Sequence, residues 1–252
     1  MSRLLTQLVA DDPAIILLGK NTIITKKIAQ SLVKEKVFVD FVPIESVSQN
    51  LQKLQSAYKI ILLYEYNHIE ALQTLSQLGV HILVVFPVIT HISTQNLANS
   101  PTFQSWAAFG EQQTQAIIDC NYYLPQANFI FAENIIVNTD YATLFDYLLL
   151  PEEKQLFIDP ATQFSLLELD AFVAELLKFV FIPKKQLSIT ISGSEVESTG
   201  YIKLIKSLYD TYYKTDVAIV QETIVEFGKI IPFSTTLIRT QTNIHSVATQ
   251  VV

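Results

Sequence analysis

Ala14-Ile15-Ile16-Leu17-Leu18-Gly19 is a short apolar run that ends in a glycine, and it is the first indication of the fold class. Such a run is typical of a strand that is buried on both faces of a parallel sheet. In the residues that follow, Ile24, Ile28 and Leu32 lie four apart on one face, which predicts an amphipathic helix. The two segments together predict the first strand and the first helix of an α/β protein.

The same alternation continues along the chain. Strands are predicted at 37–41, 60–63, 82–86, 129–132, 155–158 and 187–191, and helices at 51–57, 69–78, 109–120, 143–150, 166–180 and 198–212. Strands that alternate with helices favour a doubly wound sheet covered on both faces. We therefore predict an α/β, Rossmann-like three-layer sandwich with a mostly parallel sheet. Residues 1–252 are expected to form a single domain, with a small C-terminal lobe made mainly by 139–165 and 192–252. The chain after Asp216 shows no clear pattern.

Composition limits the classes of function. Hydrophobic residues make up 50% of the 252 residues and charged residues only 16%, whereas about 25% is usual for charged residues. This balance indicates either a large core or a surface covered by a protein partner or by self-association. The net charge of −7 argues against nucleic-acid binding, which needs clustered Lys and Arg.

Cellular location is predicted from the cysteine content and the apolar segments. The single cysteine, Cys120, excludes an internal disulfide framework and favours a reducing compartment. The first twelve residues lack the pattern of a signal peptide. The most apolar long stretch, 164–182, contains charged residues such as Glu168 and Lys178, so no membrane span is expected. The predicted location is cytoplasmic.

A late segment carries a family resemblance. Phe164-Ser165-Leu166-Leu167-Glu168-Leu169-Asp170-Ala171-Phe172-Val173-Ala174 resembles the segment of the extended short-chain dehydrogenases in which an aspartate opens a helix. As in that family, a strand at 187–191, a polar turn at Gly193-Ser194-Glu195 and a helix near Ser198 follow. The family comprises NAD-dependent epimerases and dehydratases that act on nucleotide sugars. The resemblance implies a Rossmann fold and an NAD(P) site at the first turn.

The first turn departs from the family pattern. The family carries GxxGxxG there, because the backbone must approach the pyrophosphate closely. In this chain Gly19 matches the first glycine, while Thr22 and Thr25 stand in the other two places. Asp40 matches the acidic residue that binds the adenosine ribose, although a solvated carboxylate at a strand end is an equal alternative. With Tyr64 after the third strand, Gly19, Thr22 and Asp40 are the candidate cofactor-binding residues, and we expect NAD(P) binding to be weak or absent.

The family's catalytic residues are also replaced. The family uses a tyrosine and, four residues later, a lysine that lowers the tyrosine pKa so that a proton can be exchanged with substrate. Phe109 and Gln113 stand in those places. The family's serine would follow the fourth strand, where the chain has Phe86-Pro87, with Ser93 as a distant substitute. No catalytic residue is therefore assigned from the family pattern.

Other motifs point to no site. Gly19-Lys20 is not a phosphate-binding loop, because Ala14 stands where that motif needs its first glycine. The four histidines, His68, His81, His91 and His245, lack metal-ligand spacing, so no metal is predicted.

The sequence leaves two hypotheses about function. The first is a catalytically inactive relative of the short-chain dehydrogenases that acts as a structural, regulatory or assembly subunit. The alternative is an active NAD(P)-dependent epimerase, dehydratase or reductase on a nucleotide sugar or similar small substrate, with Glu111 or His91 as acid or base.

Overall fold

The structure is a computed structural model, and it describes residues 15–64, 67–88, 101–133, 135–136, 149–150, 155–158, 163–182, 186–197, 218–221 and 235–240. The first half alternates strands and helices in the order β1 (Ile15–Gly19), α2 (Ile23–Lys34), β2 (Val39–Pro43), η1 (Ile44–Asn50), α3 (Leu51–Gln55), β3 (Lys59–Leu63), α4 (Ile69–Ser76), β4 (His81–Val88), α5 (Pro101–Tyr123) and β5 (Asn128–Glu133). The second half contains β6 (Ile135–Ile136), β7 (Leu149–Leu150), β8 (Gln155–Ile158), β9 (Gln163–Glu168), α7 (Leu169–Val180), β10 (Ser188–Ser192), β11 (Ser194–Glu197), β12 (Ala218–Gln221) and β13 (Thr236–Arg239).

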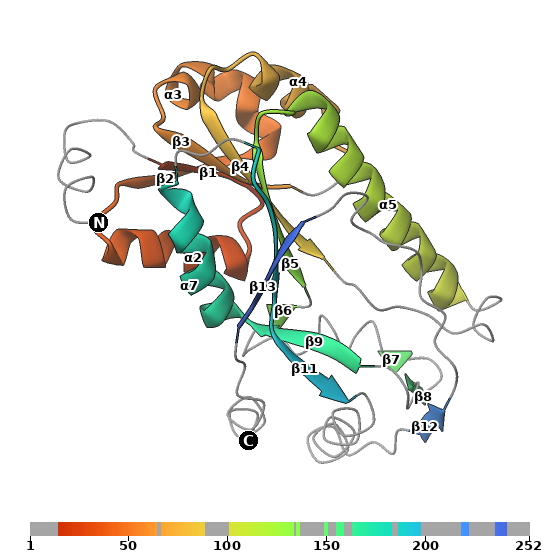
Figure 1. Ribbon diagram of the computed structural model, residues 1–252. Helices are drawn as coiled ribbons and strands as arrows, with labels where there is room; N and C mark the ends of the chain where they lie inside the picture. The colour runs from red at the N-terminus through yellow and green to blue at the C-terminus, as the bar shows by residue number, and fades with distance from the viewer. Residues whose placement is uncertain are drawn as a thin grey trace.

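A seven-stranded sheet forms the centre of the molecule (Figure 1). Its order is β13-β10-β5-β4-β3-β1-β2, and all of its strand pairs are parallel. This confirms the predicted mostly parallel, doubly wound sheet. Counted from β2, the order begins 2-1-3-4-5. The other common doubly wound order, 3-2-1-4-5-6, has a third strand outside the second one. Within the described residues, β2 is therefore an edge of the sheet.

Two apolar cores cover the two faces of this sheet, which makes the fold a three-layer sandwich. In β1, Ile16 and Leu18 face the core shared with η1, α3, α4 and α5, while Ile15 and Leu17 face the core shared with α2 and α7. Because side chains alternate along a strand, an uninterrupted apolar run is what burial on both faces requires. Residues Ile15 to Gly19 are thus fully buried, as predicted.

Several predicted boundaries were wrong. The helix expected at 166–180 begins only at Leu169, because residues 163–168 form β9, which pairs antiparallel with β11. The helix expected at 143–150 ends in a strand, since Leu149 and Leu150 pair with β8. The polar turn contracts to Gly193, because Ser194 already belongs to β11. The helix expected at 198–212 lies outside the described residues.

The later part of the chain contributes to more than one sheet. Strands β6, β9 and β11 form one three-stranded sheet and β7, β8 and β12 another. The weakly patterned tail supplies β12 and also β13, which pairs with β10 in the main sheet. Residues 236–239 thus belong to the main sheet, and the small lobe as a separate part of the domain stays a prediction.

A buried lysine ties the sheet to α7. The side chain of Lys59, at the start of β3, is almost fully buried, and its ammonium donates to the carbonyl oxygens of Val180 and Ile182. These carbonyls lie at the C-terminal end of α7, where backbone acceptors lack partners within the helix and attract a cation. Burial lowers the pKa of Lys59 from 10.5 to about 8.

This lysine makes stability depend on pH. The folded chain releases the proton near pH 8, whereas the unfolded chain holds it to about 10.5, so the unfolded state binds more protons in between. The free energy of unfolding should therefore rise with pH across that window. Relative to that of Lys59→Met, we expect the free energy of unfolding of wild type to rise by about 2 kcal/mol between about pH 7 and about pH 10. Urea denaturation of both proteins measures this, and a difference that does not change with pH would contradict it.

Candidate functional site

The carboxyl ends of the parallel strands form the edge at which open α/β sheets bind ligands. Gly19 ends β1, Leu63 ends β3, and Pro87 lies near the end of β4. In the strands on the other side of β4, Glu133 ends β5 and Ser192 ends β10. The register pairs Leu63 with Val85, so these strand ends lie at similar heights. The predicted cofactor-binding residues can be judged by their distance from this edge.

Gly19 makes a turn that no other residue can make without strain. Its φ is +147°, a value that L side chains rarely adopt, and a Cβ placed there would lie 2.6 Å from the Leu63 carbonyl oxygen. The backbone of the first βα turn therefore packs directly against the end of β3. Gly19 lies at the carboxyl edge, where it was predicted.

Two threonines close the rest of this turn. Thr22 is the N-cap of α2, and its hydroxyl oxygen accepts the Thr25 backbone N–H at 3.2 Å. The Thr25 hydroxyl donates to the Lys20 carbonyl oxygen at 2.7 Å, and the two hydroxyl oxygens lie 3.0 Å apart. In a dinucleotide site, a phosphate would use such N-terminal N–H groups. Here Thr22 already occupies one of them.

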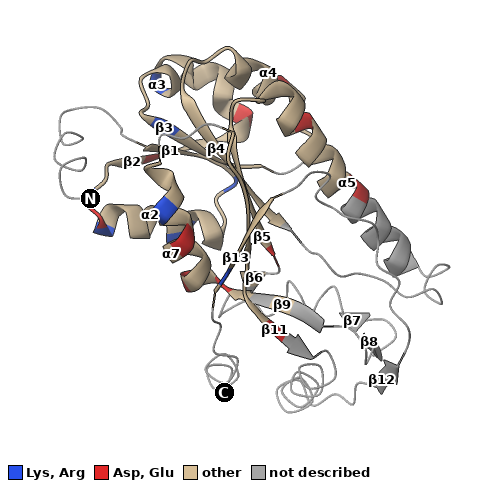
Figure 2. Cartoon of the chain, in the orientation of Figure 1, with Lys and Arg blue, Asp and Glu red and all other residues tan. Residues whose placement is uncertain are grey.

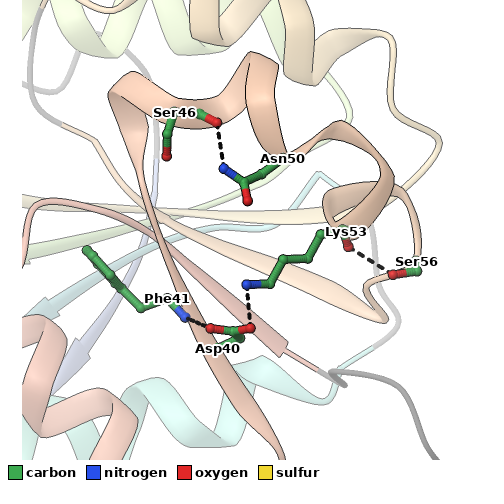
Figure 3. A network of polar contacts seen from close by, with 6 residues as sticks. All are labelled: Asp40, Phe41, Ser46, Asn50, Lys53 and Ser56. Atoms are coloured by element: carbon green, nitrogen blue, oxygen red, sulfur yellow. Dashed lines mark hydrogen bonds and ion pairs between the residues drawn. The ribbon is translucent and has the colours of Figure 1, made fainter.

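Asp40 does not lie at the carboxyl edge. The second strand runs from Val39 to Pro43 rather than over 37–41, and Pro43, not Asp40, pairs with Gly19. Asp40 is three residues earlier, about 10 Å along the strand. Its carboxylate accepts the Phe41 N–H at 2.7 Å and forms an ion pair with Lys53 of α3 (Figure 3). The ribose role predicted for Asp40 therefore loses its geometric basis.

The pKa of Asp40 follows from these contacts. Partial burial acts to raise it, but the hydrogen bond and charge of Lys53 and the Phe41 N–H outweigh that effect and lower it. The carboxylate is thus held in its charged form on the face of the sheet covered by α3.

Tyr64 lies directly after β3 but is buried. Only 3% of the residue is exposed, and its ring contacts Phe86 edge to face. Its hydroxyl oxygen accepts the His68 backbone N–H at 3.3 Å. Burial, with smaller effects from Cys120 and Asp119, raises the pKa of Tyr64 far above its usual value. This geometry makes Tyr64 a core residue near the edge, and its cofactor role stays a prediction.

On α5, the residue at the family's lysine position is bound to the sheet. Gln113 Nε2 donates to the Pro87 carbonyl oxygen at 3.1 Å, while its Oε1 is buried without a hydrogen-bond partner in the described structure. A neutral amide cannot lower the pKa of a neighbouring phenol as an ammonium does. Phe109 lies on the same helix, in a part of which only the backbone is described.

Beyond β5, a hydroxyl network holds β9 against β10. The buried Ser165 hydroxyl oxygen accepts the Ser192 hydroxyl and the Gly193 N–H, both at 2.7 Å. Arg239 of β13 and Glu195 of β11 form an ion pair at 2.6 Å. This network was not predicted, because no local pattern relates residues that lie 27 positions apart in the chain.

The described residues hold no group of three or more metal-ligating side chains. Lys and Arg are scattered over the described elements in Figure 2, without a basic stripe in this view. Among the described helices, none combines the length and apolar character that crossing a membrane requires. His91 and Ser93 lie outside the described residues.

No family model and no curated protein matches this sequence. Solved structures do match it in fold. A GDP-L-fucose synthetase from Naegleria fowleri bound to NADP is 14% identical, with 95% of this chain and 88% of that chain covered and a TM-score of 0.55. The enzyme WbmH from Bordetella bronchiseptica in complex with NAD+ is 12% identical, with 84% and 86% covered and a TM-score of 0.52. TunA, an NAD-dependent NDP-hexosamine 5,6-dehydratase, is 11% identical, with 88% and 87% covered and a TM-score of 0.52.

This chain has the fold of NAD(P)-dependent dehydratases and reductases. The resemblance to the extended short-chain dehydrogenases is thus confirmed at the level of the fold, as is the Rossmann-like class. Identities of 11–14% do not transfer an activity.

Proposed function

We propose that this chain binds an NAD(P)-type dinucleotide weakly at the carboxyl ends of β1, β3 and β4. The observation that carries the proposal is the Gly19 turn, which brings the backbone at the end of β1 against Leu63 without a side chain between them. Structures of the same fold bound to NADP and NAD+ support it. The Thr22 and Thr25 hydroxyls, which fill the turn and occupy an N–H of α2, are the reason for low affinity.

Isothermal titration with NAD+, NADH, NADP+ and NADPH tests this proposal. We expect saturable binding with a dissociation constant on the order of 0.1–1 mM. The absence of saturable binding over this range would show that the turn binds no dinucleotide. Binding about a hundredfold tighter would show instead that the two threonines do not weaken the site.

For the chemistry, solved structures of this fold include a dehydratase and a synthetase, which supports an active NAD(P)-dependent epimerase, dehydratase or reductase with atypical residues. The substrate would be a nucleotide sugar or a similar small molecule. Glu111, exposed on α5, is the described candidate for an acid or base. Turnover of nucleotide sugars with added cofactor, abolished by Glu111→Gln and retained by the neighbouring exposed variant Gln115→Ala, would support this candidate.

The contacts of Gln113 favour the second candidate, a catalytically inactive structural, regulatory or assembly subunit. The position at which the family places a cation here binds the Pro87 carbonyl oxygen through an amide. Such a subunit should bind dinucleotide without turning over any nucleotide sugar. Multi-angle light scattering with and without NADPH would then show whether the ligand alters self-association, which is the readout expected of a regulatory subunit.

A further inference from the structure

Strand β2 is an edge of the main sheet in the described structure. The Ile15 N–H donates to the Phe38 carbonyl oxygen at 3.2 Å, and Ile15 lies opposite Val39. In a parallel ladder, alternate residues direct their backbone groups to the same neighbour. Phe38 and each second residue after it therefore face β1, while the backbone groups of Val39, Phe41 and Pro43 point away from the sheet.

Two of these three outward positions offer no free N–H, and one outward carbonyl oxygen is already bonded. The Phe41 N–H donates to Asp40 Oδ1 at 2.7 Å. Proline has no N–H, so Pro43 offers no donor, and its carbonyl oxygen accepts the Ser46 hydroxyl at 2.9 Å. Of the three outward positions, only Val39 retains a backbone N–H without a bond to its own chain in the described part of the protein. An incoming strand would find one donor where an open edge of this length offers three.

The blocking carboxylate is itself held in place. Lys53 of α3 forms an ion pair with the second oxygen of Asp40, as Figure 3 shows. The turn before Lys53 is fixed by the Asn50 side chain, which donates to the Ser46 carbonyl oxygen at 2.8 Å. Because Lys53 binds Oδ2, Oδ1 remains directed at the Phe41 N–H. The consecutive elements η1 and α3 thus position Asp40 Oδ1 as an acceptor at the sheet edge.

We infer that Asp40, held by Lys53, and Pro43 close the β2 edge to strand addition, and that the partner they exclude is the same edge of a second copy of this chain. Exposed sheet edges are templates for pairing, and charged side chains and proline are the usual means of blocking them. Apolar surface would otherwise favour the pairing, since Phe38 is 61% exposed and Val33, on the adjoining helix end, is 60% exposed. Two copies related by a twofold axis would present identical edges to each other. This role is independent of dinucleotide binding.

Asp40→Ala tests the inference, because it removes the acceptor and leaves β2 otherwise unchanged. We expect the Phe41 amide to exchange with solvent about tenfold faster at low protein concentration. As concentration rises, light scattering should show a mass about twice that of wild type under the same conditions. Asp40→Asn retains an acceptor oxygen, so its exchange rate should lie between those of wild type and Asp40→Ala.

A second substitution shows whether the new contact uses this edge. Val39→Pro removes the Val39 N–H, so the double variant is left with one outward donor, at Phe41, as wild type has one at Val39. Proline is tolerated on an edge strand where no ladder bond is lost. In Asp40→Ala/Val39→Pro, the mass should return to the wild-type value. If Asp40→Ala does not fold, Lys53→Met serves instead, and faster exchange of the Phe41 amide is expected there. Unchanged exchange of that amide, or a mass equal to wild type in Asp40→Ala, would overturn the inference.

Discussion

Gly19→Ala should destabilise the protein by about 3 kcal/mol or more, which lowers the melting temperature by roughly 10 °C. Two effects add. The φ of +147° strains any L side chain, and the new Cβ would lie 2.6 Å from the Leu63 carbonyl oxygen, a backbone atom that cannot rotate away. Either β1 or β3 would have to move, and both are buried on both faces. Thermal and urea denaturation measure the loss.

Gly79→Ala is the matched control. A Cβ at Gly79 would meet nothing within 4 Å, so we expect a change within about 0.5 kcal/mol of wild type. If both alanine variants lose similar stability, the close approach at Gly19 is not the cause. If Gly19→Ala is as stable as wild type, the tight turn at the end of β1 is not required by the fold.

Thr22→Gly/Thr25→Gly should bind NADPH about tenfold more tightly than wild type. The double substitution frees the backbone N–H at position 25 and removes two side chains from the turn. One additional charge-assisted hydrogen bond from a backbone N–H to a phosphate oxygen contributes enough free energy for this change. The same change should cost about 2 kcal/mol of stability, because Thr25 is buried and glycine is a poor helix former. Calorimetric titration measures the affinity.

Thr74→Gly on α4 controls for the loss of a threonine hydroxyl in a helix. The Thr74 hydroxyl donates to the Glu70 carbonyl oxygen at 2.9 Å on the exposed side of α4, away from the carboxyl edge. The Thr74→Gly variant should lose stability without any change in NADPH affinity. If the double glycine variant binds no more tightly than wild type, the threonines do not limit affinity, and the cause of weak binding must lie at another strand end.

The candidate site was only partly predictable from the sequence. The turn that contains Gly19 and Thr22 was predicted at the correct place, because a turn after a buried strand is a local feature of contiguous residues. The cofactor role of both residues stays a prediction. Asp40 was assigned to the strand end because the strand boundary was predicted two residues too early, and a shift of that size moves a side chain from the ligand edge into the strand. The hydrogen bond from Gln113 to Pro87 joins residues 26 positions apart, and no pattern in either segment indicates it.

Local sequence patterns were enough to predict an α/β sheet protein. Apolar runs of five residues require burial on both faces, and helices with one apolar face supply that burial, so the alternation follows from local patterns. Three features are seen only in the folded chain: the strand order, the position of β2 at the sheet edge, and the contacts of Asp40 and Lys59. Those features depend on which distant segments pair, and the free energy of that pairing comes from contacts that no single segment contains.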